Sequence, residues 1–182
     1  MAVAPIFALA ELRRGRQLWI VRPVSHETMK FLHMLFFVFL AVAATAADNP
    51  YNETADAKLE IRQALTQAAP TKTPIIIVFG ANWCGDCKML DSAMKNGASA
   101  SLLSRDFKIV KVNVGHFDKN LDVAKSYGVP LEKGIPAVVI ISTNNEVLYV
   151  TREGELANAR KMGDSGIYEF FKRVTASTKA KK

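Results

Sequence analysis

The chain has 182 residues, enough for one domain with extensions. Its formal net charge of +7 is concentrated near the ends, since residues 1–46 contribute +3 and the lysines of the last four residues contribute another +3. The remaining body is therefore close to neutral, which argues against a basic surface for nucleic acid.

An apolar run near the N-terminus has the features of an export signal. Residues 31–44 are almost entirely apolar, Lys30 precedes them, and the sequence Ala-Thr-Ala follows, ending at Ala46. The run is shorter than the roughly 20 residues that a transmembrane helix needs. The order of positive charge, apolar core and Ala-x-Ala predicts a secretory signal peptide cleaved after Ala46, with an uncleaved anchor as the alternative.

The length of this signal bears on where the protein begins. Counted from Met1 the signal is longer than the usual 15–30 residues, whereas counted from Met29 its length is ordinary. We therefore interpret 29–46 as the signal peptide and 1–28 as a doubtful upstream extension. Export would make the mature protein periplasmic or secreted.

The rest of the chain is predicted to form one domain over 55–176, between a flexible leader at 47–54 and a basic tail at 177–182. Hydrophobic periodicity and turn residues define its elements. In chain order we expect a helix over 55–69, a buried strand over 75–79, a helix to about residue 95, a short helix over 99–104, a strand over 107–112, a helix over 121–127, a strand over 137–142, a hairpin return over 146–150, a polar insertion over 154–166 and a helix over 167–176. A parallel crossover followed by a hairpin predicts an α/β fold with a mixed central sheet flanked by helices.

The two cysteines of the chain, Cys84 and Cys87, lie between the first strand and the helix that follows it. A thiol at a helix N-terminus faces unpaired backbone N–H groups and the positive end of the helix dipole, which favour the thiolate. A second thiol three residues later can attack a mixed disulfide and release the substrate. A structural disulfide explains this spacing poorly, because it would close a very short loop. The pair therefore indicates thiol–disulfide exchange.

Several segments resemble the thioredoxin-fold family over roughly 55–174. Residues 81–88 read Ala-Asn-Trp-Cys-Gly-Asp-Cys-Lys, similar to the family motif Ala-x-Trp-Cys-Gly-Pro-Cys-Lys. Residues 134–137 resemble its Gly-Ile-Pro-Thr segment, 110–113 resemble its strand with a buried lysine, and 145–147 resemble its hairpin. The secreted members of this family handle disulfides in the periplasm.

The resemblance implies a role for each matching residue. Cys84 would attack the substrate disulfide, Cys87 would resolve the mixed disulfide, and Pro136 would follow a cis peptide bond. Trp83 would shield the site, and the backbone of Ile135 would pair with an extended substrate. The predicted site thus comprises Cys84 and Cys87 as catalytic residues, with Trp83, Gly85, Asp86, Ile135, Pro136 and Lys111 as substrate-binding or supporting residues.

Four positions depart from the family pattern. Asp86 replaces a proline, and its carboxylate is expected to raise the pKa of Cys84 and to favour a reductant; the alternative is that Asp86 only helps to start the helix. Val78 stands where the family has a buried aspartate that helps proton transfer, so Lys111, water or a substrate group would have to move the proton. Ser92 replaces a helix-kinking proline. The insertion at 154–166 is either a surface loop or a determinant of partner choice.

These observations predict an exported thiol–disulfide oxidoreductase that reduces disulfides of protein clients. Oxidation or isomerisation of disulfides is the alternative direction. Copper binding through the two thiolates and His116, and a binding module in which the cysteines are spectators, are the alternatives from other classes. We expect a monomer without cofactor, resident metal or nucleic-acid partner. A membrane thiol-electron transporter could supply this protein with electrons.

Overall fold

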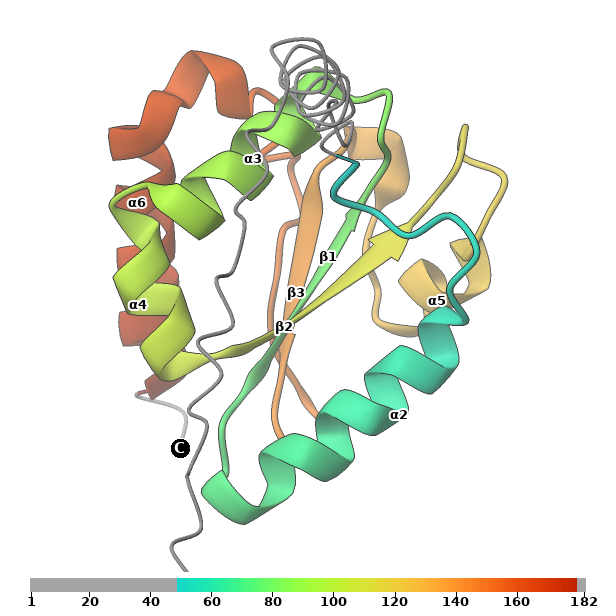
Figure 1. Ribbon diagram of the computed structural model, residues 1–182, viewed down its shortest axis with the longest axis vertical. Helices are drawn as coiled ribbons and strands as arrows, with labels where there is room; N and C mark the ends of the chain where they lie inside the picture. Colours follow the sequence, from blue (N-terminus) through green and yellow to red (C-terminus); the bar gives the residue numbers. More distant parts are fainter. Residues whose placement is uncertain (1–48, 180–182) are drawn as a thin grey trace, which may run out of the picture. The chain divides into compact units, whose positions relative to one another are not determined.

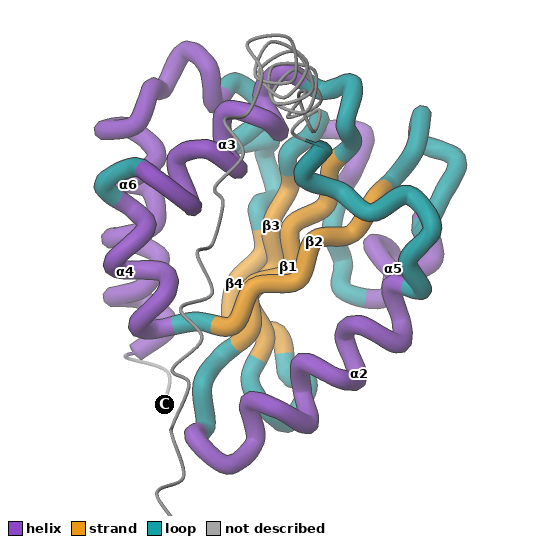
Figure 2. Tube along the Cα trace, viewed as in Figure 1, coloured by secondary structure: helices purple, strands orange, loops and turns teal. Residues whose placement is uncertain are grey.

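The computed structural model describes residues 49–179 and shows one mixed four-stranded sheet (Figures 1 and 2). The strand order is β2-β1-β3-β4. β1 pairs parallel with β2 and antiparallel with β3, which in turn pairs antiparallel with β4. The strands are β1 (Ile75–Gly80), β2 (Lys108–Asn113), β3 (Ala137–Ile141) and β4 (Val147–Val150).

Helices cover both faces of this sheet, as predicted. α3, α4 and α6 lie on one side of the sheet and α2 and α5 on the other (Figure 1). Two 3₁₀ turns, η1 (Ala69–Thr71) and η2 (Leu131–Lys133), lie in the connections. The helices are α2 (Ala57–Ala68), α3 (Gly85–Asn96), α4 (Ser99–Asp106), α5 (Leu121–Ser126) and α6 (Ala159–Lys179). This arrangement confirms the predicted thioredoxin-like α/β fold.

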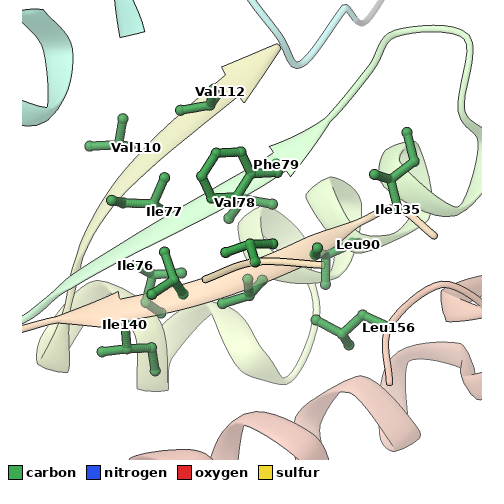
Figure 3. Packing of buried hydrophobic residues seen from close by; sticks show 14 of the residues in the cluster. Ile76, Ile77, Val78, Phe79, Leu90, Val110, Val112, Ile135, Ile140 and Leu156 are labelled. Atoms are coloured by element: carbon green, nitrogen blue, oxygen red, sulfur yellow. The ribbon is translucent and has the colours of Figure 1, made fainter. Parts of the chain in front are cut away.

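β1 and β3 form the centre of the hydrophobic core (Figure 3). Every residue of β1 and of β3 is buried, because each strand has a partner on both edges and helices on both faces. This explains why the sequence of β1 is a continuous β-branched and aromatic run rather than an alternating one. The rigid strand ends at Gly80, four residues before Cys84, and so fixes the position of the cysteine loop.

The starts of two helices differ from prediction. α2 begins at Ala57 rather than at residue 55, because the side chain of Asp56 accepts the backbone N–H of Leu59 at 3.0 Å. The insertion expected at 154–166 is partly helical, since α6 already begins at Ala159. A break at Gly163, with φ 64° and ψ −178°, separates its first turn from the main helix.

The leader differs from the flexible segment that was predicted at 47–54. Tyr51 is 2% exposed and belongs to the core cluster. Asn82 holds its backbone on both sides, accepting the Tyr51 N–H at 3.0 Å and donating to the Tyr51 carbonyl at 2.9 Å. A single buried aromatic residue thus attaches the leader to the cysteine loop.

Several predictions lie outside the described residues: the extension at 1–28, the signal peptide at 29–46 and the last three residues of the tail. Between residues 49 and 179, no helix is long and apolar enough to cross a membrane.

The packing of Tyr51 predicts a large effect of truncation. Tyr51→Ala should lower the free energy of unfolding by about 3 kcal/mol, because it leaves a cavity beside β1. Tyr51→Phe should cost less, and Leu59→Ala, at a side chain that is 43% exposed, should have little effect. Urea denaturation of the oxidised protein measures all three; a Tyr51→Ala loss no larger than that of Leu59→Ala would contradict the packing of the leader.

Candidate active site

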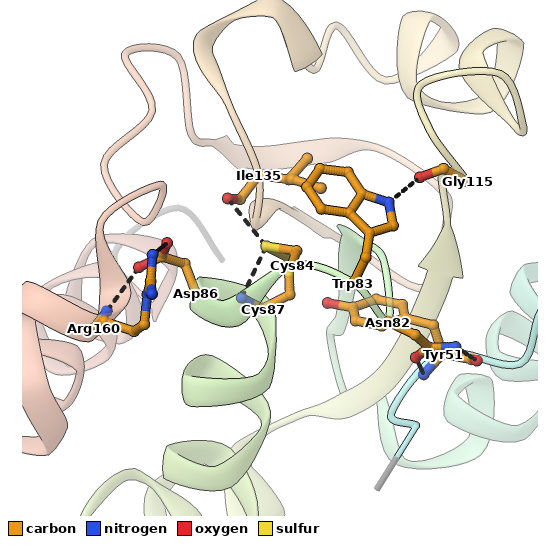
Figure 4. The surroundings of a disulfide bond; sticks show 9 residues. All are labelled: Tyr51, Asn82, Trp83, Cys84, Asp86, Cys87, Gly115, Ile135 and Arg160. Atoms are coloured by element: carbon orange, nitrogen blue, oxygen red, sulfur yellow. Dashed lines mark hydrogen bonds and ion pairs between the residues drawn. A yellow bond between two sulfur atoms is a disulfide. The ribbon is translucent and has the colours of Figure 1, made fainter. Parts of the chain in front are cut away.

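Cys84 is the N-cap residue of α3 and ends the loop that connects β1 to this helix (Figure 4). Its backbone is extended, with φ −78° and ψ 113°, and its Sγ accepts the backbone N–H of Cys87 at 3.1 Å. An N–H donor and the helix dipole both stabilise negative charge on this sulfur. The geometry therefore places Cys84 where a thiolate is favoured, as its predicted role requires.

Cys87 lies one turn further into the helix and forms a disulfide with Cys84. The Cα atoms are 5.2 Å apart, which is within the usual range for a disulfide. Cys87 is 0% exposed whereas Cys84 is 6% exposed. Only the outer sulfur of the pair can therefore be approached from solvent, so an external disulfide would meet Cys84 first.

The segment before β3 faces the cysteines. The Ile135–Pro136 peptide bond is cis, as the resemblance implied. The Ile135 carbonyl oxygen lies 3.6 Å from the Cys84 Sγ (Figure 4). This backbone group is close enough to contact a chain that is joined to Cys84.

Trp83 forms an aromatic rim beside Cys84 with the loop that follows β2. Its side chain is 51% exposed, and its indole N–H donates to the Gly115 carbonyl at 2.8 Å. The indole stacks on His116 at a centroid distance of 5.4 Å and contacts Phe117 at 6.1 Å. Because Phe117 is also 41% exposed, the rim offers apolar contact area next to the reactive sulfur.

Asp86 is paired with Arg160 on the opposite side of Cys84 (Figure 4). The carboxylate accepts the Arg160 backbone N–H at 2.9 Å and a guanidinium N–H at 3.1 Å. Burial raises the pKa of the Asp86 carboxyl, but the hydrogen bonds and positive charge of Arg160 outweigh burial, so the pKa lies below its ordinary value of 3.8. The insertion thus brings a cation to the active-site motif, which the sequence did not indicate.

Behind Cys87, Tyr51 fills the space above Gly80. A Cβ at residue 80 would overlap the Tyr51 hydroxyl and would lie 3.0 Å from the Cys87 Sγ. Glycine at this position therefore allows the phenol to approach the buried sulfur. Burial and the nearby charge of Asp91 raise the pKa of Tyr51 far above its ordinary value, so the phenol stays neutral at physiological pH.

Lys111 is paired with Asp91, a buried carboxylate that the sequence analysis did not single out. Asp91 is 3% exposed and lies one helical turn after Cys87 on the buried face of α3. Its side chain forms ion pairs with Lys111 and with Lys95, the latter at 2.7 Å. A surface cavity of about 510 Å³ includes all three side chains in its wall, so the buried carboxylate lies close to water.

The structure brings together most of the residues predicted from sequence. Cys84 and Cys87 form the disulfide, five of the others lie around it, and Lys111 lies on β2, where it pairs with Asp91. The missed residues differ in how well they could have been found. Asp91 follows Cys87 by four positions, a helical spacing that indicates a shared face. Tyr51 and Arg160 are 33 or more positions from the cysteines, and no local pattern connects either of them to the motif.

Metal ligands are a separate question, because copper binding was an alternative. Among residues 49–179, no group of three or more His, Cys, Asp and Glu side chains is placed to hold a metal ion. His116, the histidine considered for such a site, stacks on Trp83.

Comparison with known proteins agrees with this site. The family model "Thioredoxin" matches residues 55–161. The thioredoxin of Pseudomonas aeruginosa is 29% identical over 91 residues, which cover 48% of this chain and 71% of that protein. Thioredoxin 1 of Chlorobaculum tepidum is 38% identical over 74 residues, which cover 38% of this chain and 61% of the relative.

A solved structure matches over a larger part of the chain. It is the crystal structure of a disulphide isomerase from Xylella fastidiosa Temecula1, 47% identical, with a TM-score of 0.69. The match covers 71% of this chain and 99% of that one. The chain belongs to the thioredoxin family, and its Cys84–Cys87 pair makes it a thiol–disulfide oxidoreductase.

The lowered pKa of Asp86 predicts a pH dependence of stability. A carboxyl whose pKa is depressed on folding stabilises the protein above its unfolded pKa, and this contribution is lost as the pH falls through the folded value. The oxidised wild type should therefore lose stability below about pH 4, and Asp86→Asn should lose less. Denaturant unfolding between pH 7 and pH 2.5 measures this, with Glu132→Gln, at an exposed carboxylate of η2, as the control. If the free energies of unfolding of wild type and Asp86→Asn fall in parallel as the pH is lowered, the lowered pKa of Asp86 is contradicted.

Proposed function

We propose that this protein is exported and reduces disulfide bonds of protein clients. The observation that carries the proposal is the asymmetry of the cysteine pair: Cys84, the N-cap residue of α3, is 6% exposed, whereas Cys87 is 0% exposed. Such an arrangement suits one sulfur to attack and the other to resolve. The aromatic rim at Trp83 and the Ile135 carbonyl supply contacts for a client chain on either side of the outer sulfur.

The first step begins from the dithiol form. The Cys84 thiolate attacks one sulfur of the client disulfide, and a new bond joins Cys84 to that sulfur. The client S–S bond breaks, and the second client sulfur leaves as a thiolate that takes a proton from solvent. The N–H of Cys87, which contacts the Cys84 Sγ in the oxidised form, favours the attacking thiolate.

The second step needs the buried Cys87 thiol to lose its proton. Asp91 lies one turn away on the same face of α3 and is the nearest buried carboxylate along the helix. We assign it as the base that accepts the proton, either directly or through the hydroxyl of Tyr51. The Cys87 thiolate then attacks Cys84, the bond from Cys84 to the client breaks, and the client sulfur leaves and is protonated. Two electrons have passed from the protein to the client.

The direction of the reaction depends on how strongly the protein stabilises the Cys84 thiolate. Strong oxidants of this class owe their potential to a stabilised reduced form. Here the N-cap position favours the thiolate, whereas the Asp86 carboxylate opposes it and is itself partly neutralised by Arg160. These opposing effects favour a Cys84 thiolate of intermediate stability, which supports the proposal that the protein is a moderate reductant. Export and delivery of electrons by a membrane thiol transporter rest on the apolar run at 31–44 and on the need to restore the dithiol.

Isomerisation of client disulfides is the second candidate. The Xylella fastidiosa structure, 47% identical over nearly its full length, is described as a disulphide isomerase. Isomerisation uses the same first step, in which Cys84 of the dithiol form attacks a client disulfide. The two functions differ in whether Cys87 or another client thiol resolves the intermediate.

Single cysteine variants test the assigned order of attack. Cys84→Ser should reduce the rate of insulin reduction by dithiothreitol to that of the uncatalysed reaction, because the protein no longer has an accessible nucleophile. Cys87→Ser should instead accumulate a mixed disulfide between Cys84 and insulin, visible by non-reducing electrophoresis and mass spectrometry. Insulin trapped by Cys84→Ser, or reduction by Cys84→Ser at the wild-type rate, would overturn the assignment.

Replacement of Asp91 tests the proton transfer. Asp91→Asn should slow release of client from the mixed disulfide by at least about tenfold at pH 7, with the difference shrinking as the pH rises. Stopped-flow fluorescence of Trp83 follows this step. Lys95→Gln, which removes an exposed partner and leaves the buried carboxylate, should change the rate little. Equal rates for Asp91→Asn and wild type from pH 6 to 9 would contradict the role of Asp91.

A further inference from the structure

The segment between β4 and the break at Gly163 is firmly held against the domain, although it was predicted as a polar insertion. Leu156 and Ala159 are both 0% exposed, and Leu156 belongs to the hydrophobic core together with Leu90 (Figure 3). Glu155 accepts the backbone N–H of Glu153 at 3.0 Å and so closes the turn before them. This 151–163 segment therefore has a fixed position, and so does Arg160, which directly follows Ala159.

Arg160 meets the active-site motif through two separate groups. Its backbone N–H binds one oxygen of Asp86 and its guanidinium binds the other. The guanidinium also lies against Gly85, because a Cβ at that residue would be only 3.2 Å from the Arg160 Cζ. The cation is thus placed beside the residue that directly follows Cys84.

The two charges act on the Cys84 thiolate in opposite directions. Asp86 in the first turn of α3 disfavours a second negative charge at the helix N-terminus, and a guanidinium nearby favours it. Asp86 is the more buried partner, with a side chain 16% exposed against 68% for Arg160. Other ionisable groups around the cysteine loop include Lys88 on α3, Tyr51, Asp91 and Lys111, and, on the Trp83 side, Glu53, His116, Asp118 and Lys119.

We propose that Arg160 is a positioning residue that sets the reactivity of Cys84 by neutralising Asp86. This inference rests on the proposed role of Cys84 as the attacking thiolate. The 151–163 segment then supplies the charge that compensates for an acidic residue between the two cysteines. The backbone contact anchors Asp86 whatever side chain residue 160 carries, so the guanidinium can be removed without releasing the carboxylate.

Neutralising each of the two charges in the reduced protein tests this proposal without any client, because the two variants should shift the Cys84 pKa in opposite directions. Arg160→Gln should raise the pKa of Cys84 by about half a unit, which slows its alkylation by iodoacetamide about threefold at a pH at least one unit below the wild-type pKa. Asp86→Asn should lower the pKa of Cys84 and should speed its alkylation at a pH below the Cys84 pKa of the wild type. The double variant should lie close to wild type, and Arg160→Lys should recover part of the loss. Alkylation of Cys84 as a function of pH gives each pKa.

Matched controls separate this effect from general changes in charge or stability. Lys172→Gln and Glu169→Gln make the same charge changes at an exposed ion pair of α6 and should leave the Cys84 pKa unchanged. Shifts in the same direction for Arg160→Gln and Asp86→Asn, or shifts no larger than those of the controls, would overturn the proposal. A failure to reduce insulin with these pKa shifts intact would instead count against the proposed function alone.

Discussion

The N-terminus of α3 is the feature on which the rest of this molecule depends. β1 is buried along its whole length and ends at Gly80, and a short loop then places Cys84 as the N-cap residue of α3. The backbone N–H of Cys87 points at the Cys84 sulfur, so the same bond that begins the helix also favours the reactive form of the thiol. Secondary structure and chemistry are therefore set by one interaction, and the surrounding elements control access, protonation and charge at that point.

Residues from three distant segments of the chain adapt this helix end in different ways. Tyr51 and Asn82 attach the leader to the cysteine loop, and Gly80 leaves room for the phenol beside Cys87. Asp91 and Lys111 form a partly buried ion pair. This pair places a carboxylate behind the cysteines, although Val78 stands where the family has a buried aspartate. Arg160 pairs with Asp86, so the acidic residue between the cysteines does not act as an isolated charge. The two clearest departures of this sequence from its family, Asp86 and the insertion, are therefore in contact.

The sequence alone was informative where the signal is local. The apolar run of β1, the helix after Cys84 and the Gly-Ile-Pro segment depend on neighbouring residues, so the fold and the centre of the site could be predicted. The start of α2 was predicted at residue 55, two residues before its actual start at Ala57, because more than one residue here can cap a helix and the path of the leader selects Asp56. Tyr51 and Arg160 could not be predicted, since their roles come from packing between segments far apart in the chain. Asp91 could have been found from its helical spacing to Cys87.

The central claim is that a moderately stabilised Cys84 thiolate makes this protein a reductant of disulfides. The reduction potential of the Cys84–Cys87 pair tests it most directly, measured by equilibrating the protein with glutathione buffers and quantifying the dithiol form. We predict a value close to that of thioredoxin, about −270 mV. A value near −120 mV, typical of a strong oxidant, would contradict the account.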